Sequence, residues 1–140
     1  MPSALLDQVR RCYPIYNDGP GILRGDHDGF YAELFHADAE FIVPQIYPDM
    51  EDVYVGIEGL RRQRRHMEEI WEDLRWEPEQ FIESGHVVLV WVTLSGIAKQ
   101  SRAPASAHVA HVFTLRDGKV QRLEVFLDRD EALAAAGLAG

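Results

Sequence analysis

The residue with the most distinctive chemical setting is His111, which interrupts the apolar segment 109–115. Apolar surroundings disfavour the charged form of a histidine, so this ring can stay neutral near pH 7 and act as a base or as a hydrogen-bond donor. The alternative is a core histidine whose ring nitrogens bond to a neighbouring hydroxyl or carbonyl group. Which applies depends on the face of the element that carries His111.

Residues 108–128 are typical of two strands joined at Asp117-Gly118. A two-residue turn would pair His111 with Glu124 and give mixed faces. A type I turn followed by a left-handed bulge at Gly118 would instead pair His111 with Leu123. We favour the second register, because it places polar Lys119 and Gln121 only at the turn end of a face that otherwise carries Val109, His111, Phe113, Leu115, Leu123, Val125 and Leu127.

Two helical patterns supply further candidates for lining a cavity. Residues 4–16 predict a helix with Cys12 and Tyr16 on its apolar face. Residues 58–74 predict the longest helix, whose apolar stripe includes Met67 and Trp71 and also Gln63. Each has an ordinary structural alternative: aromatic residues on such stripes usually belong to the core, a glutamine can bond to the backbone, and a buried cysteine is usually a small hydrophobic residue.

Metal and nucleotide chemistry are not indicated. His108 and His111 are three residues apart on an expected strand and therefore face opposite ways, so they cannot share an ion. His27 and His36 are expected at helix ends, where they would cap or remain solvated. The sequence has no serine elbow, phosphate loop or dinucleotide fingerprint. We therefore predict neither a metal site nor a cofactor.

The overall composition predicts a single domain spanning residues 1–140, with a core large enough to need no disulfides. Its 14 basic and 23 acidic residues give a formal charge of −9, which disfavours nucleic acid and anionic membranes as partners. The basic cluster at positions 61–65 is followed by acidic residues, which is typical of a solvated helix. The one cysteine excludes an internal disulfide, and no targeting pattern or long apolar run is present, so a cytoplasmic protein is expected.

The order of the expected elements indicates the α+β class. Pro14 should interrupt the first helix, 17–21 should be a loop, and a short helix should span 26–35. A strand at 41–43, a connection over 44–52 and a strand at 53–55 precede the long helix. Strands at 76–83 and 87–94 follow, then a polar connection over 98–106 and the hairpin. Asp128 should cap a final helix that ends at Gly137.

The segments LFHADAEF, VYVGIEGLR, WEDLRWEPEQFIESGHVV and VFLDRDEALAAAGL, in that order, resemble the SnoaL-like branch of the nuclear transport factor 2-like superfamily. The resemblance implies a cone-shaped fold, in which a curved mixed sheet wraps around N-terminal helices and encloses a pocket. Family members include polyketide cyclases, ketosteroid isomerases and epoxide hydrolases, together with proteins that only bind or assemble, so the fold does not determine the activity.

The resemblance also implies a role for particular positions. Val43 matches the aspartate base of ketosteroid isomerases, and Val125 matches the acid/base aspartate of SnoaL-type cyclases. Cys12, or Tyr16 one turn later, matches the isomerase tyrosine that stabilises the oxyanion. His111 matches the protonated aspartate on the isomerase hairpin.

Three hypotheses follow. The protein is a cyclase- or isomerase-like enzyme for a small apolar polycyclic or aromatic carbonyl compound, a binding protein with the same pocket, or an interaction module whose pocket is filled. In the first hypothesis, His111 is catalytic, and the substrate is bound by Cys12, Tyr16, Val43, Gln63, Met67, Trp71, Leu123 and Val125. A homodimer is also expected, because segment 88–94 is apolar on both faces and the outer hairpin face would carry Ala110, Val112, Val120 and Phe126.

Overall fold

The computed structural model describes residues 4–44 and 52–138, and in these residues one sheet has the strand order β2-β1-β6-β5-β4-β3. Its strands are β1 (Phe35–Ile42), β2 (Val53–Val55), β3 (Trp71–Ser84), β4 (Val87–Ala98), β5 (Pro104–Arg116) and β6 (Lys119–Phe126). β1 and β6 are parallel and the other neighbours are antiparallel, so the sheet is mixed. Apart from its ends, the expected connection 44–52 lies outside the described residues.

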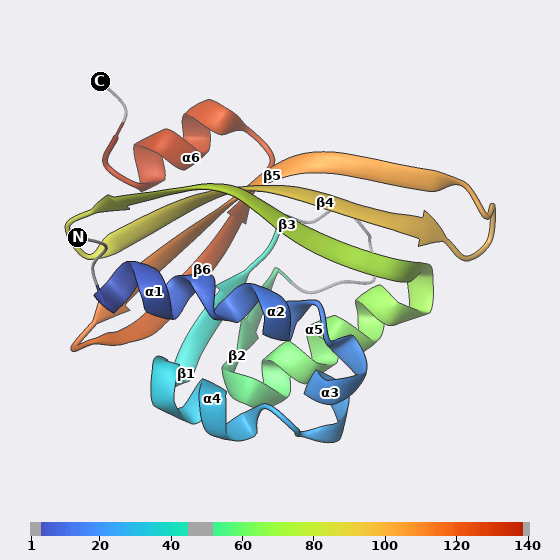
Figure 1. Cartoon of the computed structure of the whole chain (residues 1–140), viewed down its shortest axis with the longest axis horizontal. Coiled ribbons are helices and arrows are strands. Elements are labelled where there is room, and N and C mark those ends of the chain that lie inside the picture. Colours follow the sequence, from blue (N-terminus) through green and yellow to red (C-terminus); the bar gives the residue numbers. More distant parts are fainter. Residues whose placement is uncertain (1–3, 45–51, 139–140) are drawn as a thin grey trace.

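The helices lie on both faces of this curved sheet (Figure 1). On one side are α1 (Ala4–Arg10), α2 (Cys12–Tyr16), α3 (Gly19–Arg24), α4 (Asp28–Leu34) and α5 (Gly56–Ile70), and on the other is α6 (Arg129–Ala135). This arrangement confirms the predicted α+β class, with a curved mixed sheet around N-terminal helices. None of the described helices is both long and apolar enough to cross a bilayer.

Two apolar clusters account for the cover on both faces of β4. Val88, Val90 and Val92 face the N-terminal helices and belong to the main core. Leu89 faces the other way and packs in a smaller cluster with Ala132 and Ala136 around α6. Alternation along the strand thus buries every residue from Val88 to Val90, which explains why β4 is apolar on both faces. Because α6 also covers Ala110 and Val112, much of the surface from which a dimer was predicted is already buried.

The N-terminal helices differ from the prediction in two places. The first helix breaks at Arg11, before Pro14, because a proline at position 14 has no N–H to donate to the carbonyl of residue 10. The expected loop at 17–21 instead begins α3. Asp18 caps this helix by accepting a hydrogen bond from the Gly21 N–H at 3.2 Å, and a proline occupies its first turn.

The long helix ends at Ile70, four residues earlier than predicted. Trp71 and Leu74 therefore belong to β3 rather than to a helical stripe. Pairing explains the difference: β4 continues to Ala98, and its last residues form a ladder with Trp71 and Glu72. Of the expected polar connection, Ala98 ends β4 and residues 104–106 begin β5, so both strands are longer than predicted (Figure 1).

The observed hairpin register corrects the predicted one. Asp117 and Gly118 both have positive φ, 54° and 78°, as a tight two-residue turn requires, and Leu115 pairs with Val120. The register then shifts by one residue at Gln121, so that His111 pairs with Val125 and Phe113 with Leu123. The predicted pairing of His111 with Leu123 and of Val109 with Val125 is therefore wrong. Beyond the bulge, the side chains of β6 nevertheless point to the predicted faces of the sheet. The observed partners differ from the predicted ones by two residues, and a shift by two residues keeps each side chain on the same face.

The same shift corrects two positions near the turn. Val120, expected on the outer face, is fully buried in the main core opposite Leu115. Lys119, expected on the inner face, reaches away from the core and donates to the Ala32 carbonyl at 3.0 Å.

Asn17 connects the N-terminal helices to the edge strand. Its amide Nδ2 donates to the Trp76 carbonyl at 3.0 Å, and the Trp76 N–H donates to Asn17 Oδ1 at 2.7 Å. The side chain thus supplies the two hydrogen bonds that an additional strand would make to β3, which has a neighbour on one side.

Replacing Asn17 with alanine should lower the free energy of unfolding by about 1–3 kcal/mol, because it leaves the backbone groups of Trp76 without these partners. Urea denaturation measures this loss. Gln100→Ala, in an exposed turn, is the control and should change stability by less than about 0.5 kcal/mol. Equal effects of the two substitutions would show that Asn17 contributes nothing specific.

Candidate functional site

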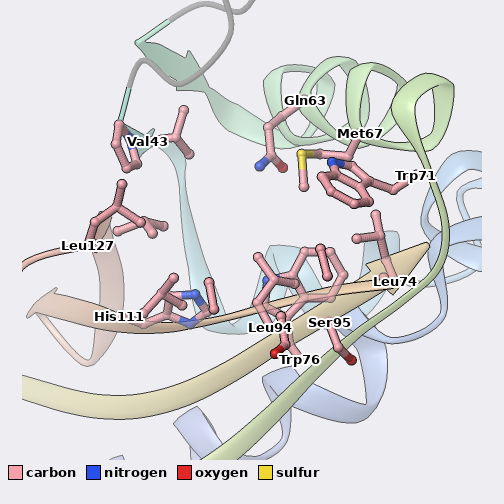
Figure 2. A pocket seen from close by; sticks show the side chains of 17 residues that line it. Val43, Gln63, Met67, Trp71, Leu74, Trp76, Leu94, Ser95, His111 and Leu127 are labelled. Carbon is pink, nitrogen blue, oxygen red and sulfur yellow. The ribbon is translucent and has the colours of Figure 1, made fainter. Parts of the chain in front are cut away.

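A cavity of about 220 Å³ lies between α5 and the strands β3 to β6 (Figure 2). Most of its lining is apolar and includes Val43, Met67, Trp71, Leu74, Trp76, Leu94, Val109, Val125 and Leu127, and its polar members include Gln63, Ser95 and His111. Leu127 is 54% exposed and Ala105 to Ala107 are also exposed, so this end of the cavity reaches solvent. A lining of this kind, with two tryptophans among mostly aliphatic residues, suits an apolar ligand group.

A smaller compartment of about 50 Å³ continues from this cavity toward the N-terminal helices. The two spaces share Val43, Gln63, Trp76, His111 and Val125. The deeper one adds Tyr16, Ile22, Phe41, Leu60, Arg64 and Leu123. His111 and Gln63 therefore stand where an apolar outer space meets a more polar inner one.

Most of the predicted binding residues come together around these two spaces. Met67 and Trp71 line the outer one, and Tyr16 and Leu123 line the inner one. Cys12 lines neither. It is fully buried, its Sγ lies 3.8 Å from the Gln8 carbonyl oxygen, and burial raises the pKa of its thiol, so it belongs to the core.

His111 is 3% exposed, and its ring is fixed by one hydrogen bond. Its Nδ1 lies 2.8 Å from the Tyr13 hydroxyl, and the two rings are nearly parallel with centroids 5.7 Å apart. No described residue forms a hydrogen bond with Nε2, and His111 lines both compartments. Burial lowers the pKa of His111 to about 4, so the ring is neutral at pH 7.

Tyr13 is a functional candidate that sequence analysis missed. The helical pattern placed it on the flank of a helix interrupted at Pro14, whereas the observed helix breaks at Arg11 and both Tyr13 and Tyr16 are buried. Their rings meet edge to face at 5.9 Å, and Tyr16 meets His111 in the same way at 6.3 Å. The spacing of three residues between two tyrosines was the signal that could have revealed this pair.

Arg64 is the second residue that was missed, because the cluster at 61–65 was interpreted as a solvated face. It is 4% exposed, its guanidinium lies 4.3 Å above the Trp76 ring, and its Nε donates to Glu68 Oε1 at 3.1 Å. Desolvation lowers the pKa of Arg64. Its neighbour Arg65 is exposed, as predicted.

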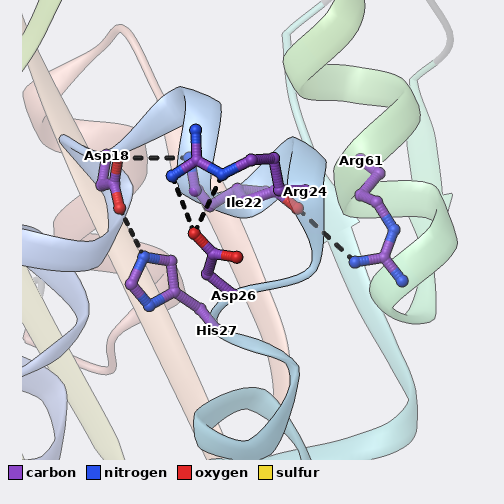
Figure 3. A network of polar contacts seen from close by, with 7 residues as sticks. Asp18, Ile22, Arg24, Asp26, His27 and Arg61 are labelled. Carbon is purple, nitrogen blue, oxygen red and sulfur yellow. Dashed lines mark hydrogen bonds and ion pairs between the residues drawn. The ribbon is translucent and has the colours of Figure 1, made fainter.

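A separate polar network surrounds α3 and has a structural role (Figure 3). His27 Nε2 donates to Asp18 at 2.7 Å, and Arg24 pairs with Asp26 at 2.7 Å. Arg61 reaches the Ile22 carbonyl at 3.5 Å and pairs with Asp28. These contacts fix the loop between α3 and α4, and the charged side chains that make them line neither compartment.

Comparison with known families agrees with this architecture. The profile of the SnoaL-like domain matches residues 9–123. The chain belongs to the SnoaL-like domain family. A comparison with curated proteins finds no match.

Solved structures share the fold of this SnoaL-like protein. TerC, co-crystallised with polyporic acid, is 24% identical, with 98% of each chain covered and a TM-score of 0.68. A nuclear transport factor 2-like protein of unknown function from Burkholderia pseudomallei is 22% identical, with 95% of this chain and 97% of the other covered and a TM-score of 0.70. A protein from Jannaschia that is provisionally named a SnoaL-like polyketide cyclase is 21% identical. The match covers 100% of this chain and 98% of the other, with a TM-score of 0.69.

The SnoaL-like cavity of this chain has no carboxylate among its described lining residues. Val43 and Val125, which were predicted to match the family's aspartates, line both compartments, and Val125 pairs directly with His111. Glu124 faces away from this pair, and Asp128 caps α6 by accepting from the Glu131 N–H at 2.9 Å. No group of three potential metal ligands occurs among residues 4–44 and 52–138.

The buried neutral His111 should make stability depend on pH. The unfolded chain takes up a proton at the ordinary histidine value of 6.5, whereas the folded chain does so only at about 4. The contribution of the neutral His111 ring to the free energy of unfolding is therefore complete above pH 6.5. On the order of 3 kcal/mol of it is lost as the pH falls toward 4. Wild type should lose this much more stability over the interval than His111→Gln, as measured by urea denaturation.

His108→Gln is the control for this measurement, since His108 is exposed on the opposite face of β5. It should retain the wild-type slope. A wild-type slope equal to that of His111→Gln would mean that the ring titrates normally in the folded protein.

Proposed function

We propose that this protein binds a flat, mostly apolar aromatic or polycyclic carbonyl compound and promotes a cyclase- or isomerase-type reaction by hydrogen bonding to its carbonyl oxygen. One observation carries the proposal: a buried, neutral His111 is held by Tyr13 through Nδ1 while Nε2 has no described partner at an apolar cavity. His111 is the proposed catalytic residue.

The hydrogen bond with Tyr13 supports a donor role for His111. Burial raises the pKa of Tyr13 far above neutral, so its hydroxyl keeps its proton. A phenol is a stronger donor than a neutral imidazole N–H, and an imidazole nitrogen is a stronger acceptor than a phenolic oxygen. We therefore assign the O–H to Tyr13, donating to Nδ1, and the ring proton to Nε2. An N–H fixed in this way stabilises negative charge that develops on a substrate oxygen.

The same setting makes His111 a poor proton acceptor. A base with a pKa of about 4 is far from the value that suits proton abstraction at neutral pH. In the proposed step a C–H bond on the carbon next to the carbonyl breaks and its proton leaves to water at the open end of the cavity. The electron pair of that bond forms a C=C bond, and the π pair of the C=O bond moves onto the oxygen. The resulting enolate oxygen accepts a hydrogen bond from Nε2.

The cavity lining supports an aromatic or polycyclic ligand. Trp71, Trp76 and Met67 offer flat or adaptable apolar surfaces, and the open volume does not support an interaction module with a filled pocket. TerC, at 24% identity, was crystallised with polyporic acid, and a neighbour from Jannaschia bears a polyketide cyclase name. These names make aromatic carbonyl compounds and polyporic acid reasonable first probes.

A matched pair of ligands tests the carbonyl contact. 2-Acetylnaphthalene should bind more tightly than 2-ethylnaphthalene, because only the former offers an acceptor to Nε2. His111→Gln should reduce this preference by roughly twofold to tenfold, the value of one neutral hydrogen bond. Titration calorimetry measures both affinities, and His108→Gln should behave as wild type.

Enolisation separates an enzyme from a binding protein. In D₂O, wild type should accelerate deuterium exchange at the acetyl methyl of 2-acetylnaphthalene, followed by ¹H NMR. His111→Gln should slow the exchange roughly 10²- to 10³-fold, as expected for the loss of an oxyanion donor. Binding that depends on His111 without any exchange would identify a binding protein.

We also propose a homodimer, although α6 covers part of the surface from which it was predicted. A groove beside α6 remains open and is lined by Trp91, Phe126 and Leu127, among others. Light scattering should give twice the mass of one chain, and a monomer at working concentration would contradict the proposal. A cytoplasmic location stays a prediction.

A further inference from the structure

The inner compartment holds a cation whose donors are incompletely used. Arg64 is 4% exposed, and its described hydrogen bond joins Nε to Glu68. No described residue forms a hydrogen bond with its two terminal nitrogens, and the Arg64 side chain lines the inner compartment. A buried guanidinium whose N–H groups lack acceptors is costly, so an acceptor is expected there.

A second unused donor lines the same compartment. Tyr16 is 6% exposed, and its hydroxyl is buried without a hydrogen-bond partner among the described residues. Because Tyr16 lines the inner compartment, this hydroxyl is a candidate donor to a group bound there. Because Arg64 and Tyr16 come from different elements, α5 and α2, their convergence is a property of the fold rather than of one helix.

We propose that this inner compartment binds an anionic oxygen group, a carboxylate or an ionised enol, on the same ligand whose carbonyl reaches His111. This inference rests on the proposed function and narrows its substrate to aromatic carbonyl acids. The volume of about 50 Å³ suits a group of a few atoms rather than a ring. His111 and Gln63 line both compartments, so one ligand can contact the outer and inner groups together.

The charges around Arg64 favour an acid over a neutral acceptor. Glu68 offsets part of the charge, but its side chain is 34% exposed and occupies only Nε. The described lining of both compartments contains no carboxylate, and the Glu68 carboxylate beside Arg64 does not line them. Planar guanidinium and carboxylate groups also match geometrically, since two parallel hydrogen bonds can form.

Isosteric acids and neutral analogues test the proposal. Wild type should bind 2-naphthoate roughly tenfold to a hundredfold more tightly than 2-naphthamide. It should also bind 2-hydroxy-1,4-naphthoquinone, which is an ionised enol at pH 7, more tightly than the 2-methoxy ether of the same quinone. The pair with the larger ratio of affinities shows whether the compartment prefers a carboxylate or an enolate. Arg64→Met should abolish the preference while changing 2-naphthamide affinity less than about threefold, and Tyr16→Phe should weaken 2-naphthoate about threefold to tenfold.

Arg65→Met is the matched control, because it removes the same charge from an exposed position on the same helix. It should keep the preference for acids. If Arg64→Met does not fold, Tyr16→Phe and the wild-type protein still decide the matter: the side-chain ¹H–¹⁵N signal of Arg64 Nε should shift with 2-naphthoate and not with 2-naphthamide.

The outcomes separate this inference from the proposed function. Equal affinity for 2-naphthoate and 2-naphthamide would mean that the inner compartment holds water only and would overturn the inference, even if 2-acetylnaphthalene still depends on His111. An equal loss in Arg65→Met would assign any preference to long-range charge and overturn it as well. If 2-acetylnaphthalene and 2-ethylnaphthalene bind equally while the Arg64-dependent preference persists, the His111 role fails and the acid site stands.

Discussion

The one-residue irregularity at Gln121 determines which side chains the last hairpin turns toward the helices. The tight turn at Asp117-Gly118 by itself would pair His111 with Glu124 and carry Leu123 and Val125 to the outer face. The additional residue restores the apolar face, so that Phe113 meets Leu123 and His111 meets Val125. The neighbouring strand accommodates the irregularity, since the pairing of β1 with β6 also shifts between Phe35 and Glu40. The cavity wall exists because this compensation occurs.

A gradient of polarity runs inward from that wall. The outer space is bounded by tryptophans and aliphatic residues, whereas His111, Tyr16 and Arg64 stand at its inner end. Trp76 connects the two regions, since its ring lies under the Arg64 guanidinium and its backbone is held by Asn17. A cation–π contact and one carboxylate partly offset the desolvation of Arg64, which is why a charge is tolerated at 4% exposure.

Local sequence patterns predicted the features that depend on residues close together in the sequence. The cap at Asp128, the apolar alternation of β4 and the placement of His111 on the inner face are of this kind. The fold class also followed from the order of the elements and from the family resemblance.

Tertiary pairing decided the features that were missed. Trp71 fits a helical stripe, but the ladder with Ala98 makes it a strand residue. Arg64 lay at the edge of a stripe within a charged cluster, and only its packing beneath α3 and against Trp76 shows that it is buried. Tyr13 became relevant because the helix breaks three residues before Pro14. For Trp71 and Arg64 a contact between residues distant in sequence outweighed a local preference, whereas for Tyr13 the helix break near Pro14 is a local effect.

Two valines occupy the positions predicted to match the family's aspartates, and both are consistent with a neutral His111. Val125 lies directly opposite His111 on the neighbouring strand, and Val43 lines the same junction. A carboxylate at either position would stabilise the imidazolium and raise the pKa of His111. The ring would then carry a proton at neutral pH and function as an acid and base. With valine there, burial is the cause that remains, and it lowers the pKa to about 4. The valines at these two positions and the buried hydrogen bond to Tyr13 thus have the same consequence, a ring that is held in place and neutral at pH 7.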